Sequence, residues 1–307
     1  MDTEKTIILK DKEEITCQEL DNDFIVVVRD YVELNRHLQE INQLFEIFQF
    51  NIERLFESYE VQSDDHIIRR DGFNTTYTDF IAINSFITNI ISSGRSLVDS
   101  IDICMKNSYG KISESYKIFE AEYKCQVYDN NFAYRFFYDL RNFSQHNHVP
   151  VSTKENFCCF DINQILNTPH FDSKKEVRRE LQRIQNEIKE KYKDIFHLSL
   201  SHSLMQYISG TAQVHKGFWI GIKNRLFELK KIIDDAVITN PGILNHNNSL
   251  FDGYILYTIP EKEEWQAFSP YADTDTYYDN CLQEAGNFFE ENNNKYLELE
   301  KHFKTCL

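Results

Sequence analysis

The sequence predicts a mainly α-helical protein, and three observations support this fold class. The 307 residues are 41% hydrophobic and 14% aromatic, a composition typical of a globular chain that buries a core. Nine glycines and five prolines are few for this length, which favours long regular elements over the tight turns of an all-β protein. Apolar residues recur at helical spacing over several long stretches. We therefore expect an up-and-down helical bundle with minor β elements, followed by a helical C-terminal extension.

The first 28 residues are expected to form a short, partly extended segment. Residues 6–9 and 24–28 are strand-like because Ile, Val and Phe are concentrated there. The start of the chain lacks the basic end and the apolar stretch of a signal peptide. No apolar run reaches the length of about 18 residues that predicts a membrane span, so we expect no membrane partner.

A long helix is predicted over residues 30–59. Its apolar positions alternate spacings of three and four residues and form one stripe, made of Leu34, Leu38, Ile41, Phe45, Phe48, Ile52 and Leu55. Such a stripe is typical of the core side of a bundle helix, and a dimer seam is the alternative.

Three more helices follow, over residues 76–105, 111–126 and 131–146. Gly94 lies inside the first of these and indicates a close approach of another helix. Residues 129–131 supply cap candidates for the third. Because the connections are short, the four consecutive helices predict a bundle over residues 29–150.

Residues 151–307 form the predicted helical extension with short strands. Helices are expected over residues 173–193, 198–237 and 277–302, and short strands over residues 156–162 and 253–259. The middle helix contains Gly210 and Gly217, which mark candidate kinks.

The charge and the cysteines restrict the function. The formal net charge is −16, from 49 acidic and 33 basic residues, so RNA would bind in a small local cleft and not over a broad basic surface. Seven scattered cysteines without a Cys-x-x-Cys predict reduced thiols in a cytoplasmic protein. His197, His202 and His215 lack the spacing of a ligand pair, so no metal is expected, and no motif predicts another cofactor.

The strongest candidate for chemistry is the end of the fourth predicted helix, where Arg141, Asn142 and His146 precede Pro150. A His exchanges protons near neutral pH, and an Arg stabilises a phosphate that gains charge. On a helix, the amide of Asn142 can face and orient the imidazole of His146. His148 also fits the spacing, but the restriction before Pro150 favours His146. An Arg and a His at this spacing occur about once by chance, so the helix end and Asn142 carry the argument.

This arrangement resembles the ribonuclease motif of the HEPN family, an Arg, a polar residue directly after it, and a His a few positions later. The resemblance covers the predicted bundle and not residues 151–307. It implies an α-helical bundle that forms a homodimer and brings two motifs together across one cleft. Many members are metal-independent endoribonucleases in toxin–antitoxin, abortive-infection and RNA-guided defence systems, and others have lost catalysis.

The resemblance implies a mechanism for single-stranded RNA. A ribose 2′-OH attacks the adjacent phosphorus, His146 acts as base or acid, Arg141 stabilises the phosphorane, and Asn142 orients the His or contacts phosphate. The resemblance also implies an antitoxin as a candidate partner. Because the chain is acidic, its substrates are either restricted to those that enter the cleft or delivered by a partner. The alternative function is a non-catalytic, HEPN-like dimeric module that binds a nucleotide or a partner protein.

Further side chains near the motif are candidates for substrate binding or support. A base can stack on Tyr138, and Tyr134 and Arg135 lie one turn earlier, although core packing is the commoner role of helix aromatics. Arg95 and Asp99 either point into the same cleft or form a surface ion pair. A purely structural interpretation is also open, in which Arg141 pairs with an acid such as Asp139.

Overall fold

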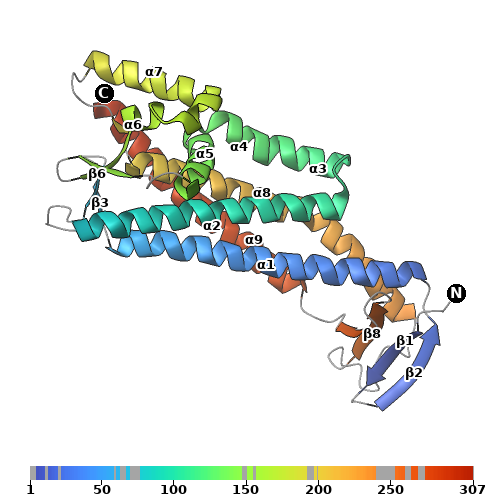
Figure 1. Cartoon of the computed structure of the whole chain (residues 1–307). Helices are drawn as coiled ribbons and strands as arrows, with labels where there is room; N and C mark the ends of the chain where they lie inside the picture. Colours follow the sequence, from blue (N-terminus) through green and yellow to red (C-terminus); the bar gives the residue numbers. More distant parts are fainter. Residues whose placement is uncertain are drawn as a thin grey trace.

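The computed structural model describes residues 5–10, 13–19, 22–58, 60–62, 67–69, 77–146, 151–154, 157–191, 197–198, 200–239, 253–259, 264–268 and 274–306. Most of these residues are helical, which confirms the predicted mainly α-helical bundle (Figure 1). The long helices are α1 (Asn22–Ser58), α2 (Tyr77–Tyr109), α5 (Phe132–His146), α7 (Lys175–Lys191), α8 (Leu200–Thr239) and α9 (Thr274–Cys306). Short helical segments are α3 (Glu114–Phe119), the π-helix η1 (Glu120–Cys125), α4 (Gln126–Asn130), α6 (Ile162–Leu166) and the 3-10 helix η2 (Pro169–Ser173).

The core bundle consists of α1, α2, α8 and α9, which is a different set of helices from the four consecutive ones that were predicted. Helices α1 and α2 form an antiparallel hairpin, in which Asn51 Nδ2 donates to Ser93 Oγ at 3.4 Å. Helix α8 packs on both of them and most extensively on α9. One continuous apolar core runs from Val28 to Ala285, so the predicted boundary at residue 150 does not separate two cores.

Long-range contacts establish the direction of α8 relative to its neighbours. Arg225 Nη2 pairs with Asp30 Oδ2 at 3.2 Å, whereas His215 stacks on Phe45 at 4.0 Å, so α8 runs antiparallel to α1. The segment predicted as part of an extension is therefore a central helix of the bundle. Its packing partners are far away in sequence, and a local apolar pattern does not identify them.

Helix α1 buries the predicted stripe, because all seven apolar positions are at most 4% exposed. The stripe continues upstream through Val28 and Tyr31, which are also buried. The strand predicted over residues 24–28 is therefore wrong, since these residues lie in α1. Their β-branched side chains favour a strand locally, but their helical spacing lets the first turns of α1 bury an apolar side.

Two glycines predicted to mark close approaches or kinks lie where helices meet. A Cβ at Gly94 of α2 would be 2.6 Å from Tyr207 Oη and 2.9 Å from Phe48 Cε2, which confirms the predicted close approach. Helix α8 runs unbroken through Gly210 and Gly217. At Gly217, the missing side chain leaves room for Tyr123 of η1.

The third predicted helix is the continuous run of α3, η1 and α4. Ser113 caps it, since Ser113 Oγ accepts from the backbone N–H of Tyr116 at 3.2 Å. Asn131 separates α4 from α5 and caps α5, because its Oδ1 accepts from Tyr134 N at 2.8 Å. Its Nδ2 donates to the Gln206 carbonyl of α8 at 2.7 Å. The predicted cap thus also attaches α5 to the bundle.

The strands of the described segments form small sheets at the two ends of the long helices (Figure 1). The larger sheet has the order β2-β1-β8-β9, formed by Glu13–Glu19, Lys5–Lys10, Gly253–Ile259 and Glu264–Phe268. Strands β1 and β8 pair antiparallel, with Ile8 opposite Ile255. The other sheets join β3 (Glu60–Gln62) to β4 (Ile67–Arg69), and β5 (Ser152–Lys154) to β6 (Phe157–Asp161) and β7 (His197–Leu198). The strands predicted over residues 6–9, 156–162 and 253–259 are confirmed by β1, β6 and β8, and the pairing of β1 with β8 places the N-terminal segment beside residues 253–259.

Two further sequence predictions concern membranes and cysteines. Of the helices in the described part of the chain, none combines the length and the apolar character that crossing a membrane requires. Cys104 and Cys281 are buried free thiols, and Cys125 is an exposed free thiol. Cys158 and Cys159 are buried.

Candidate active site

The predicted motif lies in the last two turns of α5. The apolar side of this helix is buried and consists of Ala133, Phe136, Phe137 and Leu140. Helix α5 continues unbroken to His146. Arg141 and Asn142 are half-buried, and the Nε atom of Arg141 is itself buried. The side chain of His146 and the whole of His148 lie outside the described residues, so the choice between the two histidines stays a prediction.

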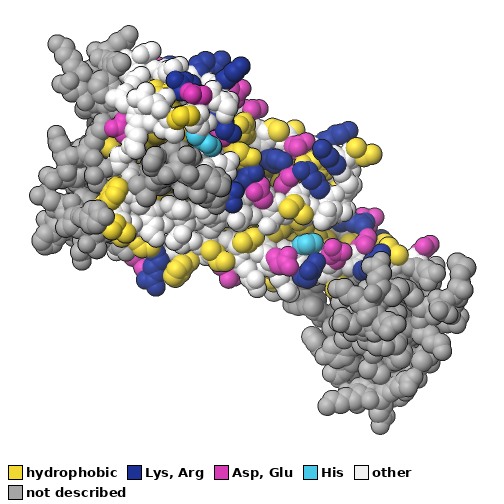
Figure 2. Space-filling model, viewed as in Figure 1, with side chains coloured by type: hydrophobic (Ala, Val, Ile, Leu, Met, Phe, Trp, Pro, Cys, Tyr) yellow, Lys and Arg dark blue, Asp and Glu magenta, His cyan; other side chains and the backbone are white. Residues whose placement is uncertain are grey.

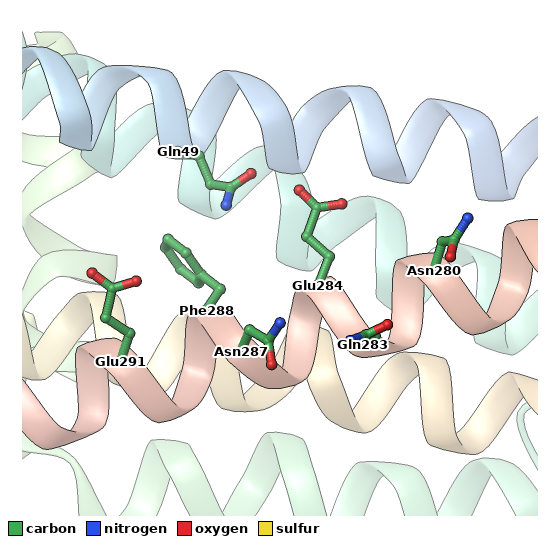
Figure 3. Close-up of a pocket in the computed structure, with 7 residues that line it drawn as sticks. All are labelled: Gln49, Asn280, Gln283, Glu284, Asn287, Phe288 and Glu291. Carbon is green, nitrogen blue, oxygen red and sulfur yellow. The ribbon is translucent and has the colours of Figure 1, made fainter.

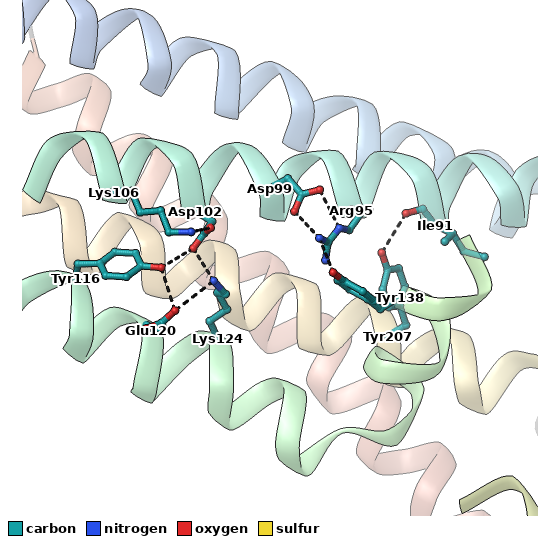
Figure 4. A network of polar contacts seen from close by, with 10 residues as sticks. All are labelled: Ile91, Arg95, Asp99, Asp102, Lys106, Tyr116, Glu120, Lys124, Tyr138 and Tyr207. Atoms are coloured by element: carbon teal, nitrogen blue, oxygen red, sulfur yellow. Dashed lines mark hydrogen bonds and ion pairs between the residues drawn. The ribbon is translucent and has the colours of Figure 1, made fainter. Parts of the chain in front are cut away.

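The charges of Arg95 and Arg141 both act on Tyr207 of α8. Burial raises the pKa of the Tyr207 hydroxyl, and these two charges are among the effects that oppose this rise. Tyr207 stacks on Phe137 at 4.9 Å and donates to the Ile91 carbonyl of α2 at 3.3 Å (Figure 4). Tyr207 therefore connects α8 to both α2 and α5.

Arg95, Asp99 and Tyr138 are in direct contact (Figure 4). Arg95 Nε donates to Asp99 Oδ2 and Arg95 Nη2 pairs with Asp99 Oδ1, each at 2.8 Å. Arg95 Nη2 also donates to the Tyr138 hydroxyl at 2.9 Å, and Cζ lies 3.7 Å from the centre of the Tyr138 ring. The predicted i,i+4 ion pair is present, and Arg95 also reaches the helix that carries the motif. The interpretation that Arg95 and Asp99 point into a common cleft stays a prediction.

Asp139 pairs with a lysine outside the motif. Its carboxylate accepts from Lys174 Nζ at 2.7 Å, and its carbonyl accepts from His170 Nε2 at 3.2 Å. The hydrogen bond to Asp139 raises the pKa of Lys174. Because residues two apart on a helix do not face each other, Asp139 and Arg141 point to different sides of α5. Asp139 therefore pairs with Lys174, and the alternative in which Arg141 pairs with an acid stays a prediction.

The aromatic residues of α4 and α5 divide into buried and exposed ones. Tyr134 is buried against Tyr207, so the core-packing interpretation holds for it. Tyr138 is half-buried, and its ring meets the edge of Tyr128 at 6.3 Å. Tyr128, which is 37% exposed, was not among the predicted site residues. It falls between two predicted helices, so its position on a helix surface was not assigned.

A second polar network lies farther along α2, around Asp102 (Figure 4). Asp102 accepts from Lys106 at 2.5 Å, from Lys124 at 2.6 Å and from the Tyr116 hydroxyl at 2.9 Å. Burial alone would raise the pKa of Asp102, but these hydrogen bonds outweigh it and lower the pKa. The network joins α3 and η1 to α2, and we therefore assign it a structural role.

A surface pocket of about 310 Å³ lies between α1 and α9 (Figure 3). It is lined by Gln49, Asn280, Gln283, Glu284, Asn287, Phe288 and Glu291. None of these residues belongs to the predicted motif or contacts α5. The pocket therefore contributes nothing to the arrangement around Arg141.

His215 is a buried core residue. Its Nε2 accepts from Trp219 Nε1 at 2.9 Å, and burial lowers its pKa to about 3. Among the described residues, no group of three or more His, Cys, Asp and Glu side chains is arranged to hold a metal ion.

The chain was compared with known proteins. No protein-family model matches it, and neither a curated protein nor a solved structure does. The functional argument therefore rests on the chemistry of the residues around α5.

Proposed function

We propose that this protein is a metal-independent endoribonuclease that cleaves single-stranded RNA at the C-terminal end of α5. The observation that carries the proposal is the unbroken course of α5 to His146. Arg141, Asn142 and His146 consequently occupy adjacent turns of one helix, and Asn142 precedes His146 by four residues, on the same side.

Each residue has a role in the proposed reaction. His146 removes the proton from a ribose 2′-OH, or supplies one to the leaving 5′-oxygen, because its ordinary pKa allows both near neutral pH. Arg141 stabilises the phosphorane through its planar set of donors, and Arg95 adds a second positive charge nearby. Asn142 orients the imidazole or contacts the phosphate.

We further propose a homodimer, in which two α5 motifs share one cleft, and a role as a toxin or an antiviral effector. The net charge of −16 repels RNA from most of the surface. RNA then reaches the site only through the cleft, or with a partner that delivers it. Size-exclusion chromatography with light scattering tests the dimer. The toxin role is tested by expressing the protein in cells: the wild type should arrest growth, and Arg141→Ala should relieve the arrest.

The test of catalysis is cleavage of mixed-sequence single-stranded RNA in EDTA, with analysis of the product ends. Products with 2′,3′-cyclic phosphates are expected. Arg141→Ala and His146→Ala should each lower the rate by about 100-fold or more, since acid–base and electrostatic catalysis each contribute at least this much.

Arg36→Ala on α1 is the matched control, because Arg36 is an exposed arginine whose charge is paired with Glu33 and Glu40. It should cleave like the wild type. His148→Ala distinguishes the two histidines. Equal cleavage by wild type and His146→Ala, with both folded by circular dichroism, would refute catalysis by His146. If His148→Ala also had no effect, the non-catalytic dimeric module would be the better interpretation.

A further inference from the structure

A continuous row of cationic and aromatic side chains crosses α2, α5 and α4 beside the motif. It consists of Arg95, Tyr138, Tyr128 and Arg135, and we call it the stacking row. Arg95 Cζ lies 3.7 Å from the centre of the Tyr138 ring, Tyr138 meets Tyr128 edge-on at 6.3 Å and 89°, and Arg135 Cζ lies 5.9 Å from the centre of the Tyr128 ring. The order is cation, ring, ring, cation.

We propose that the stacking row binds a base of single-stranded RNA, with Tyr128 as the principal stacking residue. Aromatic rings with adjacent arginines are the groups that bind unpaired bases, because every base has a π-face. Tyr128 is 37% exposed, whereas the neighbouring Tyr134 is 5% exposed and packs inward. Among the described residues, the Tyr128 hydroxyl has no hydrogen-bond partner, so it is available to the base or its ribose.

The row is held in place before RNA binds. Asp99 fixes the guanidinium of Arg95 through two contacts of 2.8 Å. Arg135 Nη1 donates to the backbone carbonyls of Tyr128 and Asp129 at the end of α4. Because these side chains are already ordered, binding a base costs little conformational entropy.

The basic start of α7 supplies positive charge for the RNA backbone. Helix α7 packs against α5, where Lys174 pairs with Asp139 at 2.7 Å. Residues 174–183 contain five Lys or Arg and two Glu, in a chain whose net charge is −16. Figure 2 shows Lys and Arg side chains over α7, with Glu side chains among them. Lys175 and Arg179 are exposed and have no ion-pair partner among the described residues. Phosphates on either side of the stacked base can bind there.

The position of the row relates it to cleavage. Asn142 and His146 follow Tyr138 by four and eight residues, which is roughly 6 and 12 Å along the axis of α5. The base on the stacking row would therefore be close to the bond that is cut. This inference rests on the proposed function, since it identifies the row as part of the same RNA site.

The test is binding of a short fluorescein-labelled RNA of mixed sequence, followed by fluorescence anisotropy. The full-length His146→Ala protein is used so that RNA stays intact. Adding Tyr128→Ala should weaken binding by about fivefold to 150-fold, the loss of one stacked base. Tyr128→Phe should retain most of the binding, because the ring remains and only the hydroxyl contact is lost. A duplex of the same sequence should compete poorly, because its bases are paired.

Phe50→Ala on α1 is the matched control. Phe50 is also an exposed ring with an arginine over it, since Arg54 Cζ lies 5.0 Å from its centre, but it belongs to α1, whereas α5 packs mainly on α2, α4, α7 and α8. Its replacement should leave RNA affinity unchanged. Arg179→Glu should weaken binding and reduce its salt dependence, because one phosphate contact is lost.

The outcomes separate this inference from the proposed function. Unchanged RNA affinity of the Tyr128→Ala protein would overturn the stacking row, even if Arg141→Ala abolished cleavage. Equal losses from Tyr128→Ala and Phe50→Ala would overturn it as well. Weaker binding by Tyr128→Ala alone would support the row. If the wild type then left RNA uncut, only the nuclease would be refuted.

Discussion

Gly217 is where α8 approaches η1 most closely, and Gly217→Ala tests this contact. An added Cβ would lie 2.2 Å from Cγ and Cδ1 of Tyr123 and 2.8 Å from Tyr123 Cβ. Carbon atoms in contact are normally about 3.5–4.0 Å apart, so one helix must move. Rotation of the Tyr123 ring does not relieve the clash, because Tyr123 Cβ is attached directly to the backbone of η1.

The expected change in stability is a difference of two effects. Overpacking costs about 1–3 kcal/mol, and alanine gains about 1 kcal/mol over glycine inside a helix. We expect Gly217→Ala to lower the free energy of unfolding by up to about 2 kcal/mol, because the backbone must shift. Gly286 of α9 is the matched control, since a Cβ there would meet nothing within 4 Å. Gly286→Ala should raise the free energy of unfolding by about 0.5–1 kcal/mol.

Urea unfolding followed by circular dichroism measures both changes. The same substitution in two long helices of one bundle should change stability in opposite directions. A similar gain from both variants would refute the close approach of α8 and η1. A change in the slope of unfolding free energy against urea would instead indicate an altered unfolded state.

Three further predictions concern the core and its polar contacts. Burial lowers the pKa of His215 to about 3, from an ordinary value of 6.5, so below pH 6.5 the unfolded chain binds a proton that the folded chain does not. This histidine should therefore reduce stability by about 1.4 kcal/mol per pH unit on acidification. Urea unfolding between neutral pH and pH about 4 should show a shallower loss for His215→Gln, and parallel curves would contradict this. Asp102→Asn should lower the free energy of unfolding by about 1–3 kcal/mol, because two lysines lose their charged acceptor; unchanged stability in urea would mean that the network is not formed. Asn131→Ala removes the cap of α5 and should cost about 0.5–2 kcal/mol, and a neutral effect on thermal unfolding would exclude that cap.

Elements with a strong local pattern were predictable. The stripe from Leu34 to Leu55 specifies the buried side of α1, because apolar residues that recur about every 3.6 positions predict an amphipathic α-helix. Asn131 was predictable as a cap from its residue type and position. By contrast, residues 24–28 have strand-forming side chains, and their burial against the bundle outweighs that local preference.

Which helices pack together was not predictable, because several helices have apolar sides of similar character and the sequence does not distinguish which of them meet. Nothing near Phe45 indicates that its neighbour is His215. The same reason limits how much of the candidate site could be predicted from the sequence. Arg95 and Tyr138 were identified separately as candidates, and their contact depends on the packing of α2 against α5. Tyr128 was missed because the helix was predicted to end before it.

The central position of α8 has a consequence for the protein during synthesis. Helices α1 and α2 can pack on each other as they leave the ribosome, but the apolar surface that they and α5 present to α8 stays uncovered until residues 200–239 have been made. Strand β1 likewise waits for β8. A nascent chain of this kind depends on chaperones more than one in which each helix packs on its predecessor. It also gains any site built on α5 only when translation is nearly complete.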